Sequence, residues 1–279
     1  MDNSKKDIDA IWSEIQPIIF DEFKQLFPDD KVLMHNFTAI AELAKGVQLT
    51  ADNAGRELAL SYLREAERDL RSCKVLRSKK IHPHAVYHLQ QAVEKTTKGY
   101  VLGFGLLSGK DIYTHDTPML FLKAVFDKTG LRSWANQSGD QDVKQLMDNA
   151  YQAISEEAKR QEIVRMSYSS IKAHLSRIDS YQSVSKQLCK NLIAEVTSTS
   201  GIGLPLSPLL QSISALPTLF ILAAISFPHE EYTRYPNRDI TPSDYIASLG
   251  VVRSISNMMK YLSPEIQELK EILSLGGSC

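Results

Sequence analysis

Two stretches of helix-period hydrophobicity, joined by only a few residues, dominate the first half of the sequence. The first runs from about residue 52 to Lys79-Lys80 and places small and apolar side chains at steps of four and three: Ala59, Leu63, Ala66, Leu70 and Cys73. The second opens at His82-Pro83 and presents on one face Ala85, Leu89, Val93, Thr96 and Tyr100. Proline is favoured at the first position of a helix. Because the link is so short, we expect two long helices packed antiparallel as a hairpin.

The remainder of the chain also follows the helical period, and the strict alternation that is typical of half-buried strands is scarce. A capping box at Thr241-Pro242-Ser243-Asp244 predicts the start of a late helix. Its buried stripe should contain Tyr245, Leu249, Val252, Ile255, Met259 and Leu262. Ser263-Pro264 should start a separate, last short helix. The sequence therefore predicts an all-α fold.

The composition excludes some classes of protein. The chain has 279 residues, of which 43% are hydrophobic, so it can bury a core and is not a disordered chain. Lys and Arg number 32 against 33 Asp and Glu, which excludes a globally basic surface but not a local basic patch. The scattered Cys73, Cys189 and Cys279 argue against a disulfide framework. Together with a polar N-terminus that lacks a signal peptide, they favour the cytoplasm.

One segment has the composition of a membrane span. From Leu204 to Phe227 the chain carries no charge and reaches the roughly 20 residues that cross a bilayer. However, it contains Pro205, Pro208 and Pro217, and its unbroken apolar core is short. A buried helix of a soluble bundle fits better, and we expect no membrane association.

Several signatures of catalysis and cofactor binding are missing. No glycine-rich loop ends in Gly-Lys-Ser/Thr, and no His-Glu-x-x-His is present. His84 and His88 share a helix face, but no carboxylate stands at ligand spacing beside them. We therefore expect neither a metal site nor a cofactor. Glu94 and Lys98 stand four apart in the favourable order, and their simplest interpretation is an exposed ion pair worth about 0.3–0.5 kcal/mol.

Four ordered segments resemble the HEPN domain family, whose members are small helical bundles with a proposed nucleotide-binding role. They are Ala66-Glu67-Arg68-Asp69-Leu70, the stretch from Gln90 to Lys98, Thr114-His115-Asp116 and Arg234-Tyr235-Pro236. The resemblance covers about 52–128 and 205–262, and it implies a HEPN-like four-helix bundle core.

The resemblance also implies a division of the chain. In order, the predicted units are an N-terminal helical extension (1–50), a first part of the core (51–129), a helical insertion (130–204) and a second part of the core (205–279). The insertion is longer than a usual connection, so we expect it to fold as a helical subdomain.

Many HEPN proteins are metal-independent ribonucleases that carry Arg-x4-6-His at the start of the last core helix and act as dimers. No histidine stands four to six residues after Arg234 or Arg238. Arg77 followed by His82 has the required spacing, but it lies at the predicted hairpin turn. The weak catalytic candidates are thus two pairs, Arg77 with His82 and Arg234 with His115.

The Arg-Tyr-Pro segment resembles a non-catalytic, antitoxin-like branch of the family, often encoded beside a nucleotidyltransferase. The resemblance implies a polar groove that binds a nucleotide, RNA or a partner and that is lined by Asp69, Gln91, Glu94, Lys98, His115, Arg234 and Tyr235. We expect a binding module that acts as a homodimer or with a nucleotidyltransferase partner, in a toxin–antitoxin or defence pair. Three alternatives stay open: a network of interhelical hydrogen bonds, a ribonuclease, and a structural interaction protein.

Overall fold

The structure is a computed structural model. It describes residues 53–107, 112–113, 115, 117–122, 124, 156–180, 182–183, 215, 218–236 and 239–275. The predicted extension, 1–50, lies outside the described residues, as does most of the predicted insertion.

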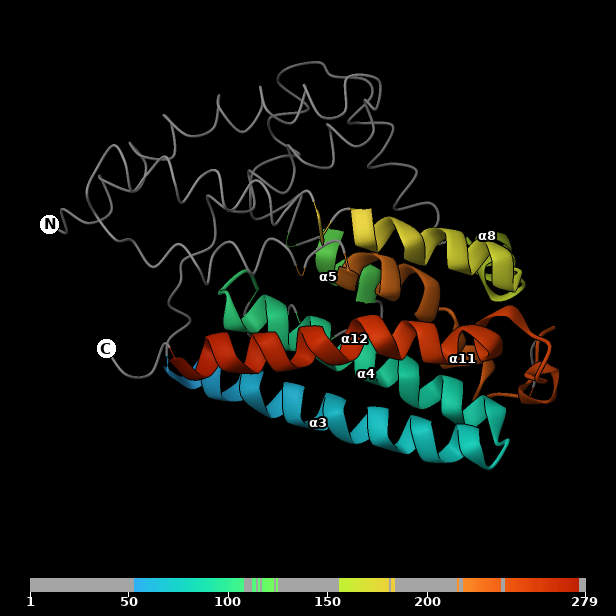
Figure 1. The fold of residues 1–279 in the computed structure, drawn as a ribbon, viewed down its shortest axis with the longest axis horizontal. Coiled ribbons are helices and arrows are strands. Elements are labelled where there is room, and N and C mark those ends of the chain that lie inside the picture. Colours follow the sequence, from blue (N-terminus) through green and yellow to red (C-terminus); the bar gives the residue numbers. More distant parts are fainter. Residues whose placement is uncertain are drawn as a thin grey trace, which may run out of the picture.

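The predicted hairpin is present as helices α3 (Asn53–Ser78) and α4 (His82–Gly103), which pack against each other along their length (Figure 1). All ten positions of the two predicted apolar series are buried. The turn between the helices places Lys80 at a φ of 60°, and proline occupies the first turn of α4 as expected. The hydrophobic period and the turn residues were therefore sufficient to predict this half of the core.

A third long helix, α12 (Gly250–Leu275), packs against both helices of the hairpin (Figure 1). The prediction of a separate last helix at Ser263-Pro264 is wrong, because α12 continues through Pro264. The proline removes one backbone hydrogen bond, but Leu262 and Ile266 on either side of it are both buried in the same core. Continuity of the apolar face thus outweighs the loss of one hydrogen bond.

The predicted capping box is observed, but it caps a short 3-10 turn, Pro242–Asp244. The helix α12 begins six residues later, at Gly250. A β-carbon at Gly250 would lie 2.0 Å from the carbonyl oxygen of Met166, so only glycine permits this close approach. Glycine thus brings the start of α12 against the segment around residue 166.

Residues 168–180 are helical and lie alongside α12. Two side-chain hydrogen bonds connect the two elements, Asn257 to Tyr168 (3.2 Å) and Tyr261 to Asp179 (2.8 Å). Gln182, which follows this segment, donates to Glu265 of α12 at 2.8 Å. This segment also contributes to the main core Ile171, Leu175 and Ile178. The described part of the predicted insertion therefore shares one hydrophobic core with the hairpin, while the domain boundaries at 129 and 204 stay predictions.

Shorter helices complete the described fold, and they are α5 (Thr117–Leu122), α8 (Glu157–Val164), α11 (His229–Tyr232) and the helical residues 218–226. Both α5 and α11 pack on α4. All regular elements in these described ranges are helices, so the fold is all-α as predicted. Within the same ranges, no helix is both long enough and apolar enough to cross a bilayer.

Candidate functional site

A cluster of polar side chains surrounds Glu94 in the middle of α4. Glu94 is only 3% exposed, and its Oε1 accepts a hydrogen bond from Lys98 Nζ at 2.7 Å. The Nδ1 atom of His115 lies 3.3 Å from the same oxygen, whereas Gln90 and Gln91 donate to Oε2 at 3.2 and 3.3 Å. The simple interpretation of Glu94 and Lys98 as an exposed ion pair is therefore wrong, because both residues are buried.

Tyr62 of α3 lies beside this cluster and was not singled out from the sequence. The Lys98 ammonium lies 6.0 Å from the centre of the Tyr62 ring. Burial raises the pKa of Tyr62, and the nearby Tyr113 and Glu94 raise it further. The cluster around Glu94 thus includes an aromatic wall contributed by the other helix of the hairpin.

Asp69 makes a different set of contacts. Its two carboxylate oxygens lie 2.8 Å from His88 Nδ1 and 2.5 Å from Lys95 Nζ, both on α4. These contacts connect α3 to α4 on the helix face next to that of Glu94. Of the predicted groove residues, Asp69 therefore fits the alternative of an interhelical network.

Arg234 is half-exposed and follows α11. Its guanidinium lies 5.6 Å from the ring centre of Tyr87 and 5.1 Å from that of Tyr235. Glu230 lies 2.6 Å from Arg234 Nη1, and this hydrogen bond raises the pKa of the arginine. We call Arg234, Tyr87 and Tyr235 the stacking platform.

The stacking platform and the cluster around Glu94 use the same face of α4. Tyr87 and Glu94 are seven residues apart, which corresponds to two helical turns and about 10 Å along the axis. Arg234 contacts the first of these residues and His115 the second. The structure therefore brings the predicted groove residues 91, 94, 98, 115, 234 and 235 onto one side of α4, but it does not pair His115 with Arg234.

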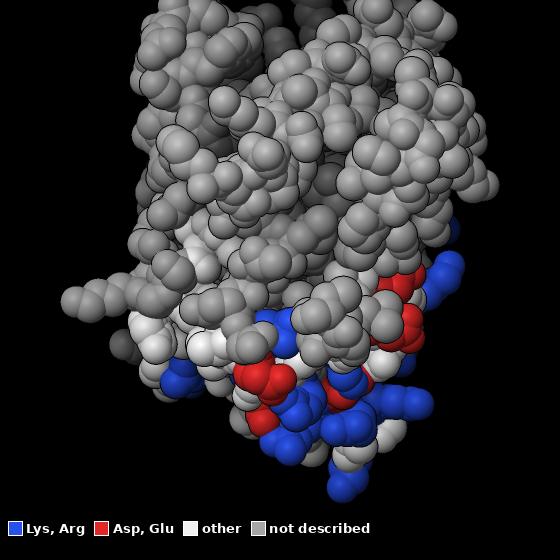
Figure 2. All heavy atoms as spheres, turned by 90° about the vertical axis from the view of Figure 1, so that its left-hand side faces the viewer, with Lys and Arg blue, Asp and Glu red and all other residues white. Residues whose placement is uncertain are grey.

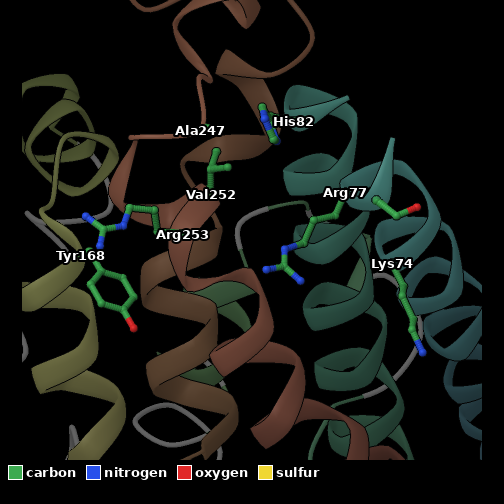
Figure 3. Close-up of a pocket in the computed structure, with 8 residues that line it drawn as sticks. Lys74, Arg77, His82, Tyr168, Ala247, Val252 and Arg253 are labelled. Atoms are coloured by element: carbon green, nitrogen blue, oxygen red, sulfur yellow. The ribbon is translucent and has the colours of Figure 1, made fainter. Parts of the chain in front are cut away.

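A pocket of about 660 Å³ lies between the α3–α4 turn and the start of α12 (Figure 3). Its lining residues are Lys74, Arg77, Ser78, His82, Tyr168, Ala247, Val252 and Arg253. Arg77 and His82, which the sequence joined only by their spacing, line the same pocket. Four of the lining residues are basic and none is acidic. We call this site the basic pocket.

Sequence reasoning missed most of the basic pocket. Lys74 precedes Arg77 by less than one turn of α3, and the run of basic residues that ends in Lys79-Lys80 could have indicated a cationic helix end. Nothing local indicated Tyr168 or Arg253, whose guanidinium lies 4.6 Å from the ring centre of Tyr168. Their proximity depends on the packing of residues 168–180 against α12.

Some charged side chains elsewhere on the described surface are paired. Figure 2 shows the face on the left of Figure 1, where blue and red side chains lie next to one another. Lys270 lies 2.8 Å from Glu67, and Arg64 lies 3.8 Å from Glu57.

The described residues contain neither a reactive cysteine nor a cluster of side chains that could bind a metal ion. Cys73 is buried, and burial raises the pKa of its thiol to about 12, so it does not supply a thiolate near neutral pH. Over the ranges that the structure describes, no group of three His, Cys, Asp or Glu side chains is placed to hold a metal ion.

Comparison with models of protein families identifies the family to which the chain belongs. A family model of the HEPN domain matches residues 59–198, which is half of the chain. The chain belongs to the HEPN domain family. HEPN domains are associated with RNA binding, ribonuclease activity and toxin-like modules. No curated protein and no solved structure matches the chain.

The HEPN match includes α3, α4 and the polar residues around Glu94. It continues through 130–198, the stretch predicted to be an insertion, and it ends before Arg234. Membership of the Arg-Tyr-Pro branch, which depends on residues 234–236, therefore stays a prediction. The family match ends before α11 and α12, so only the structure shows that these two helices pack against the hairpin.

Proposed function

We propose that this HEPN-family protein is a nucleotide- or RNA-associated binding module that does not cleave its ligand. The observation that supports the proposal is the stacking platform, in which a half-exposed Arg234 lies over the rings of Tyr87 and Tyr235. Unpaired bases stack on aromatic rings and on guanidinium planes. Arginine also binds phosphate through two parallel hydrogen bonds. The platform thus combines the two contacts that single-stranded RNA requires.

The rest of the groove has a more modest role in this proposal. His115 has a side chain that is 70% exposed and extends the polar face of α4 away from the platform. Glu94 and Lys98 are buried and neutralise each other, so they orient His115 and Gln91 rather than contact the ligand themselves. RNA would therefore contact the platform first and His115 second.

The proposal that the ligand is not cleaved is supported by where His115 and Arg234 contact α4. Hydrolysis of RNA needs a base for the ribose 2′-hydroxyl and a cation for the charge that develops on the same phosphate. His115 and Arg234 contact α4 about 10 Å apart. The proposal therefore does not assign these two side chains to one phosphate.

The binding proposal can be tested with a fluorescently labelled single-stranded RNA and measurements of anisotropy. We expect Arg234→Gln and Tyr235→Ala each to weaken binding at least about fivefold, since one base stacked on an aromatic ring contributes about 1–3 kcal/mol. Arg64→Gln is the matched control, because Arg64 is an exposed arginine that pairs with Glu57 on α3. Equal affinity of all four proteins would refute the platform as the RNA site.

A metal-independent ribonuclease is the second candidate, and one observation favours it. Arg77 and His82 have the spacing of the family's nuclease motif and line the same pocket. Incubation of labelled RNA with the purified protein and EDTA tests this activity. Cleavage that disappears in Arg77→Ala and His82→Ala would replace the binding proposal, as would cleavage that depends on His115 and Arg234.

The biological setting is a further part of the proposal. We place the protein in a toxin–antitoxin or defence pair, as a homodimer or with a nucleotidyltransferase partner, because the HEPN family includes toxin-like modules. Light scattering measures the oligomeric state, and a monomer at working concentration would contradict the homodimer. A neighbouring gene for a nucleotidyltransferase would support the partner, whereas a purely structural interaction protein would bind neither RNA nor nucleotide.

A further inference from the structure

We propose that one end of the helical bundle is a docking surface for an acidic peptide segment of a partner protein, which inserts an apolar side chain into the basic pocket. The surface consists of residues 74–81, at the turn between α3 and α4, and residues 246–253, at the start of α12 (Figure 1). We call it the basic end. It is separate from the stacking platform, so the inference does not rest on RNA binding there.

Charge is distributed unevenly along the hairpin. All four acidic residues of α3 lie in its first two thirds, and no Asp or Glu occurs between residues 70 and 93, where there are five Lys and Arg. The stretch 245–264, which contains the start of α12, also lacks acidic residues. Because acidic residues slightly outnumber basic ones in the whole chain, the two signs are separated within the hairpin rather than unbalanced overall.

The cations of the basic end lack counter-charges in the described part of the chain. Five of them are exposed and form no ion pair with a described carboxylate: Lys74, Arg77, Lys79, Lys80 and Arg253. Nearer the start of α3, by contrast, Arg68 pairs with Glu65. Accessible charges of one sign attract and orient a partner of the opposite sign, so the basic end suits an acidic partner.

The helix dipole accounts for only part of this charge. Cations are favourable near the C-terminus of a helix, and Arg77 lies in the last turn of α3. Arg253, however, lies in the first turn of α12, where the dipole disfavours a cation. Neither α4 nor α12 has an acidic residue in its first turn, although such residues are favourable there. Stabilisation of the separate helices therefore does not explain the charge at this end, whereas binding of carboxylates does.

Aliphatic side chains are exposed among these cations. Ile246 is 58% exposed and Ile81 is 38% exposed, and each is next in sequence to a residue that lines the basic pocket, Ala247 and His82 respectively. Val252 adds an apolar side chain to the pocket itself. Aliphatic surface gains free energy when another apolar group covers it, and phosphates and sugars supply no such group. The combination of cations and aliphatic residues thus favours a peptide over a nucleic acid.

The shape of the basic end favours a peptide over a membrane. The basic pocket has a volume of about 660 Å³, which a flat bilayer surface would leave unfilled. In Figure 3 Arg77 extends from α3 toward the space that faces α12, whereas Lys74 points away from it, and Arg253 lies beside Tyr168. An apolar anchor in the pocket would therefore lie between cations, which neighbouring carboxylates of the same segment could reach. Interface anchors of this kind fill pockets and carry much of the binding energy.

The experiment measures binding of a fluorescein-labelled peptide to the full chain by anisotropy at low ionic strength, where attraction between charges is least screened. The probe has three glutamates on each side of a central tryptophan. One control peptide replaces the glutamates by glutamines, and the other replaces the tryptophan by alanine. We expect each control to bind at least about tenfold more weakly, because docking needs both the charges and the anchor.

Variants of the protein test the two components of the surface. Ile246→Ser should weaken binding of the probe at least about threefold, and Arg77→Gln combined with Lys79→Gln at least about fivefold. Leu58→Ser and Arg64→Gln are the matched controls, because they replace an exposed aliphatic residue and an exposed arginine on the other half of α3. Both should leave binding unchanged. Ile246→Leu keeps the apolar surface and should retain full affinity, which separates loss of contact from loss of folding.

Equal affinity of the probe and either control peptide, or of the wild type and both test variants, would refute the docking surface. Single-stranded RNA and vesicles that contain phosphatidylserine are tested with the same variants. RNA that displaces the probe and loses affinity in the double variant would assign the basic end to RNA, and vesicle binding that Ile246→Ser abolishes would assign it to a membrane. Either result overturns the inference. Arg234→Gln should weaken RNA binding at the stacking platform and leave affinity for the probe unchanged, so failure of the proposed function is distinguishable from failure of this inference.

Discussion

The cluster around Glu94 and the basic pocket both include residues of α4, yet they differ in whether the charged side chains have partners within the protein. At Glu94 one buried carboxylate is surrounded by donors from Lys98, Gln90 and Gln91. In the basic pocket several cations face a cavity and the described residues supply no anion. The first arrangement is complete within the described residues, whereas no described residue lining the pocket compensates the charges of the second.

This difference distinguishes two roles of polar residues in a helical bundle, one in holding the helices together and one in binding. A buried charge with all its hydrogen bonds made reports on how the helices are held together. A group of like charges that remains accessible reports on what the protein binds. The residues that resemble the family signature at Glu94 belong to the first kind, and Arg77 belongs to the second.

The largest predicted effect is at Glu94. Glu94→Ala removes the partner of the buried Lys98 and leaves an uncompensated charge, so we expect unfolding to require about 3–5 kcal/mol less free energy. Urea denaturation monitored by circular dichroism measures the loss. A decrease below about 1 kcal/mol would show that solvent reaches Lys98 and that the cluster is not buried.

Two control variants sharpen that result. Glu65→Ala removes an exposed partner of Arg68 on α3 and should cost no more than about 1 kcal/mol. Replacing both Glu94 and Lys98 by apolar residues of similar volume should cost less than Glu94→Ala alone, because no charge is then left buried.

Periodicity predicted the hairpin, since each helix of it buries one continuous stripe and the turn carries a local proline signal. It could not predict that Glu94 and Lys98 are buried, because their cover includes His115 and Tyr62 from other segments. It also failed at Pro264, where a local rule about proline was overruled by packing on both sides. Local rules are thus reliable where local interactions dominate.

The basic pocket was beyond sequence reasoning for the same reason. Arg77 and His82 are five residues apart, so their spacing was visible, but it was one match among many basic residues and histidines. Tyr168 and Arg253 join them only because residues 168–180 pack alongside α12. A site assembled from three separate segments needs the tertiary structure to be recognised.

His229 is a third case, in which a buried titratable side chain stays neutral near neutral pH. Its Nδ1 atom lies 2.8 Å from the Tyr245 hydroxyl, and complete burial lowers its pKa from 6.5 to about 3. Because the unfolded chain binds the proton and the folded chain does not, this contribution to stability is intact above pH 6.5. It is lost progressively as the pH falls from 6.5 toward 3.

From this pKa we expect His229 to lower the free energy of unfolding by about 2 kcal/mol between pH 7 and pH 5. Urea denaturation at both pH values measures the difference. In His229→Gln, which has no proton to gain, the same pH change should have a smaller effect. Equal pH dependence in the two proteins would mean that His229 is protonated in the folded state.

The smallest predicted effect is at Arg77 in the basic pocket. It tests whether a charge without a partner contributes less to stability than the paired charge of Glu94. Arg77→Gln removes a cation that has no carboxylate partner in the described structure. Its removal relieves repulsion from Lys74 and Arg253, so the free energy of unfolding without ligand should stay within about 0.5 kcal/mol of the wild-type value or rise. The same urea experiment at low ionic strength, where repulsion is least screened, gives the measurement. A loss of more than 1 kcal/mol would mean that Arg77 stabilises the fold as Glu94 does, and the contrast between a completed network and an open site would disappear.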